Sequence, residues 1–497
     1  MKFLFTKKKM LLSIFLVFIL IIIAFLDVSQ GSKLSFGKFL PDTLKLFLKK
    51  TVLLPAKMNN DLKVMENDLK EMKGLNQTIK NTHSERSIIN SLNNFNLSLK
   101  KIKLNIDGYV SANREKPFGY IEFIDKKLIL ITSFGDIFIV PEKKLKDNYD
   151  QKNYFEIKLK NQIFEKELDY KKDFRLIKNN LKKNYLLDRN YEKNREDIFW
   201  GNSYFDRSPK SITDIKVANG YLYISFIAEI TDRCFIVNVI RSKINIYTNE
   251  MIFEDFFMPK TCTYTENILD IRRSGGRINY LNNEIFLTTG EYRVLQSSQD
   301  DDSLNGKIIS INEFTKEYRV LAKGLRNAQG LALKDNLLAV SDHGPYGGDE
   351  VNLVRLEKKY FNFGWPVSSY GLHYNRKFRE NAPLYKSHEK YGFVEPLDFF
   401  MPGVGPSEVL FDTDNFFNLE KKKDHDILLL FTLGDKEHYY EGDNSIHAFL
   451  YDKNSLKKTG HKVIYVGHRI RDAKITKDKI YLILDDFGLG LIEKTSF

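Results

Sequence analysis

The chain has 497 residues and a formal net charge of +12, from 77 Lys+Arg against 65 Asp+Glu. A hydrophobic content of 42% is enough for a sizeable core, which excludes wholesale disorder. The length fits about three average domains, or one large repeat fold with additions. The 38 Phe and 26 Tyr, together with many Ile, Val and Thr, favour sheet over helix.

The excess positive charge is concentrated at the N-terminus. Residues 1–58 carry +8 of the +12, so the rest of the chain is nearly balanced. The sequence has no zinc-finger spacing and no Arg-rich tract. A nucleic-acid partner is therefore not expected.

Residues 1–30 predict a cytoplasmic Lys cluster and a transmembrane anchor. Lys7–Lys9 precede Met10–Leu26, an apolar run in which Ser13 is the only polar side chain. At a rise of about 1.5 Å per residue, such a helix just crosses a bilayer core. The Lys cluster predicts a cytoplasmic N-terminus and an exported body. The alternative is a cleaved signal peptide, for which residues 29–31 are a weak cleavage site. We favour a single-pass inner-membrane anchor with a periplasmic body.

Residues 31–104 predict an amphipathic and helical stalk followed by a linker. Within Pro41–Leu54 an apolar stripe faces a Lys-rich side, so this helix either lies on anionic lipid or packs on the body. A heptad seam follows, formed by Met58, Leu62, Met65, Leu69 and Met72. Two heptads are fewer than a coiled coil requires, so the 58–72 helix indicates a stalk with possible self-association. Residues 74–100 are rich in Asn, Ser and Lys and resemble a linker.

From residue 105 to 497 one strand pattern recurs six times. A polar turn, an alternating apolar strand and a polar or Gly-containing end appear at 127–133, 220–226, 284–290, 336–343, 426–434 and 479–485. Period-two alternation bounded by turn residues is typical of strands. The shorter spacings match the 40–50 residues of a β-propeller blade. We therefore predict an all-β, six-bladed β-propeller, with a charged insertion near 143–200.

The two cysteines, Cys234 and Cys262, lie 28 positions apart. In an exported body they would form a disulfide between neighbouring strands of one blade. The alternative is two buried free thiols. No Cys-x-x-Cys pair occurs, so zinc and thioredoxin chemistry are not supported.

The densest group of chemically capable residues lies in 324–366. Gly344-Pro345 and the acidic pair Asp349-Glu350 form a tight loop after a strand. Such a loop presents backbone carbonyls beside two carboxylates, which are hard oxygen ligands suited to Ca²⁺. Arg326 and Asn327 precede it, and both side chains bind planar carboxylates or carbonyls.

These segments resemble the glucose/sorbosone dehydrogenase family. The family pattern is close to G-x-R-N-x-Q-G, then H-G-P-x-G-G-D-E-x-N, then N-Y-G-W-P, and this chain matches at 324–330, 343–352 and 362–366 with Phe363 for Tyr. The motif at 467–472 and the G-G-R segment at 275–277 add to the likeness. The resemblance covers about residues 210–497. It implies a six-bladed propeller that oxidises aldose sugars with pyrroloquinoline quinone (PQQ) and Ca²⁺.

The resemblance also implies roles for individual residues. Arg326, Asn327, Arg469 and Arg471 would contact the quinone. The carbonyls of Gly344 and Pro345 would bind Ca²⁺, while Asp349 and Glu350 would support that loop or hold a second Ca²⁺. His343 lies at a position near the cofactor, although a structural histidine is the alternative. The cofactor-binding candidates are therefore Arg326, Asn327, His343, Arg469 and Arg471, and the metal candidates are Gly344, Pro345, Asp349 and Glu350.

One departure from the family concerns the catalytic base. The family has a His just before the G-G-R segment, where this chain has Arg273. Arginine stays protonated and cannot accept the proton of a sugar hydroxyl. The acid after T-x-G is also changed, to Glu291, and Gly434 stands where a Lys is sometimes used. Either another His, with His343 the candidate, supplies the base, or the chain is a non-catalytic propeller that binds carbohydrate or protein.

Overall fold

The computed structural model describes residues 89–494, apart from short gaps. These gaps are 106–118, 133–134, 146–149, 157–158, 170–172, 186–211, 232, 246–247, 266–267, 346, 358–359, 372–387, 435–443 and 486. The described residues all lie in the unit His83–Phe497. The predicted anchor and heptad helix lie outside the described residues. No helix among the described residues is long and apolar enough to cross a membrane.

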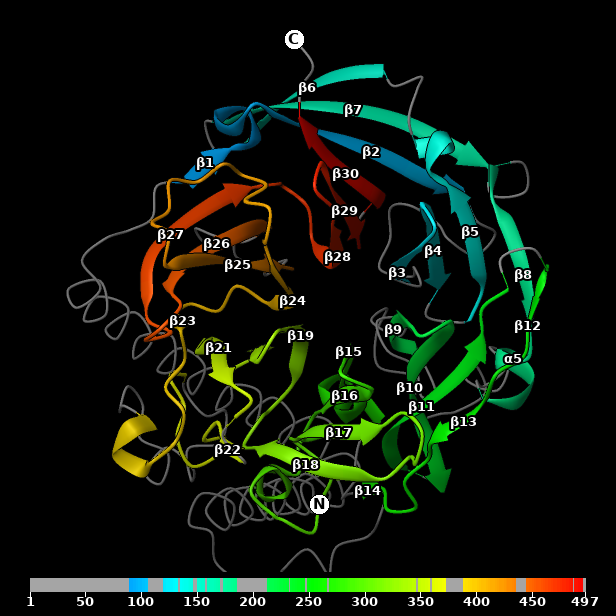
Figure 1. The fold of residues 1–497 in the computed structure, drawn as a ribbon, viewed down its shortest axis with the longest axis vertical. Helices are drawn as coiled ribbons and strands as arrows, with labels where there is room; N and C mark the ends of the chain where they lie inside the picture. The colour runs from blue at the N-terminus through cyan, green and yellow to red at the C-terminus, as the bar shows by residue number, and fades with distance from the viewer. Residues whose placement is uncertain are drawn as a thin grey trace, which may run out of the picture. The chain divides into compact units, whose positions relative to one another are not determined.

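Six sheets, each with a core of antiparallel strands, are arranged around a common centre (Figure 1). The innermost strands are β3 (Gly119–Ile124), β9 (Ile212–Ala218), β15 (Gly275–Leu281), β19 (Ala328–Lys334), β24 (Pro406–Phe411) and β28 (Ile470–Ile475). We number the blades 1 to 6 in the order of these innermost strands. Each innermost strand contacts the next, and β28 contacts β3, so the ring is closed. The prediction of a six-bladed β-propeller is therefore confirmed.

The six recurring strands of the sequence are the second strands of the six blades. They are β4 (Lys127–Thr132), β10 (Tyr221–Thr231), β16 (Glu284–Thr289), β20 (Leu337–Asp342), β25 (His425–Thr432) and β29 (Lys479–Leu484). Each of these strands pairs with a neighbour on both edges. Its two faces are also covered, because each blade packs between two others. Strands covered on both faces are apolar at successive positions and not only at alternate ones, so these strands are more fully buried than the predicted alternation implies. β20, for example, is buried along its whole length.

The outer strands complete each blade. The third strands are β5 (Ile137–Pro141), β11 (Cys234–Lys243), β17 (Ile308–Asn312), β21 (Asp349–Arg355), β26 (Ser445–Asp452) and β30 (Gly488–Lys494). The fourth strands are β8 (Arg175–Asn179), β13 (Glu254–Phe257), β18 (Tyr318–Lys323), β23 (Asp398–Phe400), β27 (Lys458–Tyr465) and β2 (Leu97–Asn105). Blade 6 is therefore closed by a strand from the beginning of the propeller.

Short elements are added at the edges of the blades. The added strands are β1 (Ile89–Ser91), β6 (Asp150–Glu156), β7 (Leu159–Asp169), β12 (Glu250–Met251), β14 (Thr263–Tyr264) and β22 (Phe361–Asn362). The short helices are η3 (Leu92–Phe95), η4 (Glu142–Leu145), α5 (Leu181–Asn184), η6 (Ile268–Arg273), η7 (Leu295–Ser298) and η8 (His388–Tyr391).

Tight turns join the first and second strands of three blades. Asp125-Lys126, Asn219-Gly220 and Asn282-Asn283 have positive φ at both positions. Two such residues in a row match the twist of a two-residue hairpin. These turns fix the register of β3–β4, β9–β10 and β15–β16.

Apolar side chains fill the spaces between neighbouring blades rather than the centre. One cluster joins Leu222 and Ile224 of β10 to Ile129 and Ile131 of β4. Each other pair of adjacent blades shares a similar cluster. Since the apolar residues occupy these interfaces, polar and charged side chains are left to fill the centre.

The N-terminal boundary of the propeller differs from the prediction. Residues 31–104 were expected to be a stalk and linker, but Ile89–Asn105 form β1, η3 and β2. β2 pairs with β30 along seven residues and also with β7. Its Leu97, Leu99 and Ile102 are buried. The intervening Lys and Ser residues give the segment a linker-like composition, which concealed the strand.

The charged insertion contains both added and integral structure. β6 and β7 form a hairpin between the third and fourth strands of blade 1, and β7 pairs with β2 of blade 6. β8 returns to blade 1 and pairs with β5. The hairpin is thus inserted into blade 1 but extends the edge of blade 6.

The two cysteines are joined in a disulfide, with 5.3 Å between their Cα atoms. Cys234 opens β11, and Cys262 precedes β14, which pairs with the first residues of β11. The bond therefore ties the β14 segment to blade 2.

Arg277 of β15 lies at the centre of the propeller and is bound by three carboxyl groups. Its Nη1 is 3.2 Å from Asp214 Oδ1, 3.0 Å from Asp472 Oδ1 and 3.2 Å from Glu408 Oε2. These acids come from the innermost strands of blades 2, 6 and 5. All four side chains are buried.

The remaining contacts of Arg277 reach the other blades. Nε donates to the carbonyl of Gln329 at 2.5 Å, and Nη2 donates to those of Ser407 at 3.1 Å and Arg471 at 2.7 Å. The guanidinium also lies 5.1 Å from the centre of the Tyr120 ring. One side chain of blade 3 thus contacts every other blade.

Burial raises the pKa of two of the acids at this centre, Asp214 and Glu408. Lys474 lies 3.9 Å from Glu408 and 3.7 Å from Asp472, so two cations face three acids. Burial raises the pKa of Glu408 to about 8, although Arg277 and Lys474 act in the opposite direction. Asp472 keeps its charge, because Lys474 and Arg277 outweigh the effect of burial and lower its pKa.

Replacing Arg277 with Met is expected to destabilise the propeller strongly. The change keeps an unbranched side chain but leaves buried carboxylates without their cation, which costs about 3–5 kcal/mol. Urea unfolding measures the effect. Arg319→Met is the control, because Arg319 is exposed where it pairs with Glu284, and such pairs are worth about 1 kcal/mol or less. Equal losses in the two variants would show that Arg277 does not organise the centre.

Replacing Glu408 with Gln is expected to flatten the pH dependence of stability. The pKa of Glu408 is about 8 in the folded chain and lies near 4.5 when unfolded, so the folded state binds the proton more tightly. The resulting stabilisation is complete below the unfolded pKa and is lost as the pH rises through about 8. Unfolding free energies at several pH values between these limits test this. A variant with the slope of the wild type would contradict it.

Candidate functional site

The propeller topology gathers the sequence motifs at one end of the ring. In every blade the second strand runs antiparallel to the first. Residues just before a first strand therefore lie beside residues just after a second strand. Arg273, Arg326 and Arg469 precede first strands, whereas Glu291 and His343 follow second strands. We call this end of the ring the site end.

Arg326 and Asn327 are fixed by the carboxyl group of Asp342 at the end of β20. The backbone N–H groups of Arg326 and Asn327 donate to it at 2.7 and 2.6 Å. Burial raises the pKa of Asp342 to about 7, even though these two N–H groups oppose the shift. Arg326 Nη1 donates to the carbonyls of His343 and Gly344, both at 2.7 Å. These two carbonyls therefore already hold one cationic group.

Asn327 links two of the sequence motifs. Its Oδ1 accepts from the backbone N–H of Gly275 at 3.2 Å and from Gln329 Nε2 at 3.1 Å. Asn327 is buried. Its side chain thus joins the G-G-R segment of blade 3 to blade 4.

The Gly-Pro loop is held by Asp349. Its two carboxylate oxygens accept from the backbone N–H groups of Gly344 and Gly405, each at 2.8 Å. Burial raises the pKa of Asp349 to about 6 against the effect of these N–H groups. The loop is tight, because a Cβ on Gly344 would lie 2.3 Å from the carbonyl oxygens of Gly347 and Gly348.

Glu350 contacts a histidine that the sequence motifs do not contain. His388 Nε2 lies 3.2 Å from Glu350 Oε1, and His388 Nδ1 lies 2.6 Å from Ser368 Oγ. All three residues are buried, and His388 is 0% exposed. His388 lies 38 positions after Glu350, and no spacing rule in the sequence connects them.

A small cavity lies among these residues. Its volume of about 10 Å³ is close to the minimum that holds one water molecule. Its lining includes Arg326, His343, Gly344, Glu350, Trp365 and Ser368. The cavity therefore brings together a quinone candidate, two metal candidates and the base candidate His343.

Arg469 and Arg471 lie in blade 6 and bind different kinds of partner. Arg469 Nη1 donates to the carbonyls of Leu433 at 2.9 Å and Gly434 at 2.6 Å. Arg471 forms a bidentate pair with Asp485, with Nε–Oδ1 at 3.0 Å and Nη2–Oδ2 at 2.5 Å. The charge of Arg471 is therefore balanced by a carboxylate, whereas Arg469, like Arg326, holds two neutral carbonyls.

Arg273 forms an ion pair with Glu291. Arg273 Nη1 lies 2.7 Å from Glu291 Oε1, and the two side chains are 13% and 0% exposed. The backbone fixes the pair, since Tyr292 N–H donates to the Arg273 carbonyl at 3.3 Å and Glu291 N–H donates to the Arg326 carbonyl at 2.9 Å. The position expected for the base thus holds a cation locked to a buried carboxylate.

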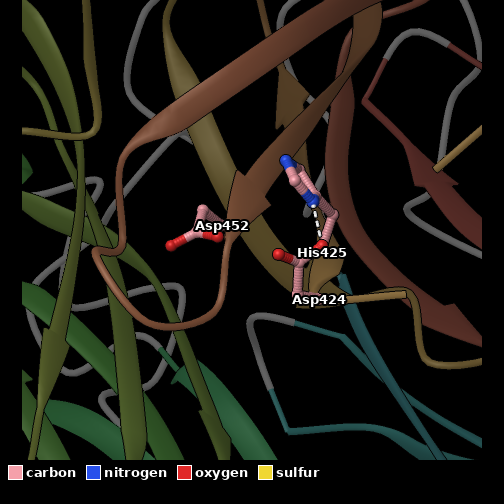
Figure 2. A group of neighbouring side chains, drawn as sticks. All are labelled: Asp424, His425 and Asp452. Carbon is pink, nitrogen blue, oxygen red and sulfur yellow. Dashed lines mark hydrogen bonds and ion pairs between the residues drawn. The ribbon is translucent and has the colours of Figure 1, made fainter. Parts of the chain in front are cut away.

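A group of possible metal ligands lies at the other end of blade 5. Asp424, His425 and Asp452 are shown in Figure 2, where His425 Nδ1 is hydrogen-bonded to Asp424 Oδ1 at 2.9 Å. His425 opens β25 and pairs with Asp452 across the ladder. Since β25 runs toward the site end, this group lies away from the predicted site. Asp452 Oδ1 already accepts from Ser455 N–H and Oγ.

The donor set at the site end fits an anionic ligand that carries carbonyl groups. Arg326 and Arg469 are cations held by neutral carbonyls, and guanidinium forks suit carboxylates. The carbonyls of His343 and Gly344 bind a cationic group in this structure, so their chemistry also fits a metal ion. These residues are therefore compatible with PQQ and one Ca²⁺.

The chain also matches a model of a known protein family. Residues 217–492 match the model of the glucose/sorbosone dehydrogenase family. The chain belongs to this family. The matched segment contains every motif residue discussed above, from Arg273 to Arg471.

Individual relatives cover less of the sequence. The chain is 28% identical over 234 residues to the aldose sugar dehydrogenase YliI of Escherichia coli strain K12, which covers 43% of this chain and 56% of that protein. It is 26% identical over 251 residues to an uncharacterised protein of Synechocystis, covering 44% of this chain and 54% of that protein. The chain thus spans about half the length of the curated relatives it matches.

Solved structures agree on the fold. The soluble aldose sugar dehydrogenase of Escherichia coli in its apo-form matches with a TM-score of 0.53 at 18% identity, over 80% of this chain and 99% of that one. A glucose dehydrogenase crystal structure matches with a TM-score of 0.54 at 17% identity, over 77% and 96%. At these identities the likeness shows the propeller fold alone.

Replacing Arg273 with Ala is expected to destabilise the chain by about 3 kcal/mol, because Glu291 would remain buried without its cation. The double variant Arg273→Ala/Glu291→Ala removes both charges and is expected to lose less. Urea unfolding at neutral pH compares them. If the double variant lost the sum of the two single effects, the residues would not act as a pair.

Proposed function

We propose that the protein is a membrane-anchored, periplasmic sugar dehydrogenase that oxidises aldose sugars with PQQ and Ca²⁺. The observation that carries the proposal is the pair of guanidiniums, Arg326 and Arg469, at the site end. Both hold neutral carbonyls of loops that follow second strands. Guanidinium forks at these positions suit the carboxylates of an anionic ligand.

Different residues at the site end would bind different parts of the cofactor. Arg326 and Arg469 would bind carboxylates of PQQ, and Asn327 and Asp342 would keep Arg326 in place. The carbonyls of Gly344 and Pro345 would bind Ca²⁺, which would replace the Arg326 Nη1 that holds the Gly344 carbonyl in this structure. The bound quinone supplies the two-electron oxidant for the sugar, and the protein orients it. Arg471 would act with Asp485 to fix the loop after β29, since its charge is already balanced.

The proton of the sugar hydroxyl needs an acceptor other than Arg273. The Arg273–Glu291 pair keeps the guanidinium in a fixed position, and a guanidinium does not deprotonate in proteins. His343 is the candidate, because it lines the cavity beside Arg326. Its imidazole would accept the proton as a general base.

A second function rests on the same ion pair. Without a base, the site end would bind a carbohydrate or a protein partner and perform no oxidation. The observation that favours this alternative is the burial of Glu291 beneath Arg273, which makes the pair a stable part of the structure. The two functions differ in whether PQQ turns over.

The membrane location is part of the proposal. It is supported by the Lys7–Lys9 cluster and the apolar run Met10–Leu26, which together indicate an anchor with a cytoplasmic N-terminus. A disulfide between Cys234 and Cys262 suits an oxidising compartment. Anchoring would keep the propeller close to membrane-bound electron acceptors.

Restoring the family residues is expected to increase turnover. The double variant Arg273→His/Glu291→Asp places an imidazole beside a carboxylate, and a general base contributes about 10²-fold or more. The assay follows dye reduction by the full-length chain with PQQ, Ca²⁺ and a panel of aldoses. Arg272→His is the matched control, because it adds an imidazole one position away.

The assay separates the two functions. PQQ-dependent turnover by the wild type supports the dehydrogenase, and a further increase in the double variant but not in Arg272→His supports the role of position 273. If the wild type bound no PQQ at millimolar Ca²⁺, the dehydrogenase proposal would be wrong. If it bound PQQ and sugar without turnover, the binding function would replace it.

A further inference from the structure

The two acidic residues of the Gly-Pro loop are engaged by protein groups. Both carboxylate oxygens of Asp349 accept backbone N–H groups, from Gly344 and Gly405. Glu350 Oε1 faces His388 Nε2 at 3.2 Å, and Glu350 Oε2 accepts from Asn352 Nδ2 at 3.3 Å. Each of the four oxygens therefore has a donor within the protein.

His388 is held rigidly beside Glu350. Its second ring nitrogen lies 2.6 Å from Ser368 Oγ. The edge of its ring packs against Tyr370, with ring centres 4.9 Å apart. Tyr370 in turn stacks on Phe399 at 4.1 Å and donates to Glu395. Both ring nitrogens and one edge of the His388 ring are therefore in contact with protein groups, which holds the imidazole in one orientation beside Glu350.

The surroundings of Glu350 do not suit a second calcium ion. Ca²⁺ takes six to eight oxygen ligands at about 2.3–2.6 Å. The group facing Glu350 is instead a nitrogen of His388. The adjoining cavity has room for about one water molecule and is walled on one side by Phe363 and Trp365.

We propose that the imidazole of His388 takes the place of a metal ion at Glu350, so that this chain holds its Gly-Pro loop without a second Ca²⁺. Asp349 ties the loop to the segment before β24, and His388 ties Glu350 to the segment after β22. The loop carbonyls at 343 and 344 are then positioned by protein contacts alone. This inference goes beyond the proposed function and does not depend on PQQ.

Thermal unfolding of the full-length chain, without PQQ, tests the inference. Any change in the Tm of the wild type between EDTA and millimolar Ca²⁺ is expected to be the same in Glu350→Gln, because Ca²⁺ on the carbonyls of Gly344 and Pro345 does not use Glu350. His388→Ala is expected to lose about 4 °C or more in EDTA, because Glu350 loses a buried hydrogen bond. Millimolar Ca²⁺ is expected to restore at least half of that loss, and His388→Ala/Glu350→Gln is expected to show no such recovery.

Two further variants serve as controls. His388→Gln keeps a donor toward Glu350, so its Tm is expected to respond to Ca²⁺ as that of the wild type does. His447 is a buried histidine of blade 5 that pairs with His461 at 2.9 Å. His447→Ala is expected to lower the Tm with no recovery in Ca²⁺, since the ring of His447 packs on Phe400 and Phe449 and its Nδ1 faces the imidazole of His461.

Two results would overturn the inference. The first is a rise in the Tm of the wild type with Ca²⁺ that is absent in Glu350→Gln, because His388 would then be a co-ligand of a metal. The second is a failure of Ca²⁺ to restore His388→Ala. If His388→Ala does not fold, the Ca²⁺ response of the Tm in the wild type is compared with that in Glu350→Gln, and this comparison tests the inference by itself. Loss of PQQ-dependent turnover would not affect either result.

Discussion

The contacts of one buried guanidinium connect the whole propeller. Arg277 binds carboxyl groups of blades 2, 5 and 6 and backbone carbonyls of blades 4, 5 and 6, and its face packs near Tyr120 of blade 1. The apolar side chains do not connect all six blades at the centre, because they pack in the six interfaces between neighbouring blades. A charged centre costs desolvation energy, and it is tolerated only when every charge is paired and hydrogen-bonded. Here the acids face Arg277 and Lys474, and Arg277 also donates to three backbone carbonyls.

The same innermost strands that supply the charged centre also present the functional residues. Arg273, Arg326 and Arg469 precede these strands, and each binds a loop that follows a second strand. The site end is therefore built by arginines that reach from one strand connection to another. The hydrogen bonds of these guanidiniums differ, since Arg273 Nη1 binds the carboxylate of Glu291 whereas Nη1 of Arg326 and of Arg469 each bind two backbone carbonyls.

The sequence predicts the fold well where burial is strongest. The six second strands are covered on both faces, and their apolar runs are visible without a structure. The contiguous motifs at 324–330 and 343–352 also form one site, because both adjoin strands of blade 4. The strand at 97–105 was missed, because its buried Leu and Ile alternate with lysines and it pairs with the far end of the chain. Two features depend on tertiary structure alone and could not be predicted from any local sequence pattern. They are the proximity of His388 to Glu350 and the contacts of Arg277 with the other blades.

The central claim is that the site end binds PQQ through Arg326 and Arg469. A crystal structure of the full-length chain grown with PQQ and Ca²⁺ tests this most directly. The account predicts the quinone at the site end, in contact with Arg326 and Arg469, and Ca²⁺ on the carbonyls of Gly344 and Pro345. A structure in which PQQ is absent from this end, or lies elsewhere on the propeller, would contradict it.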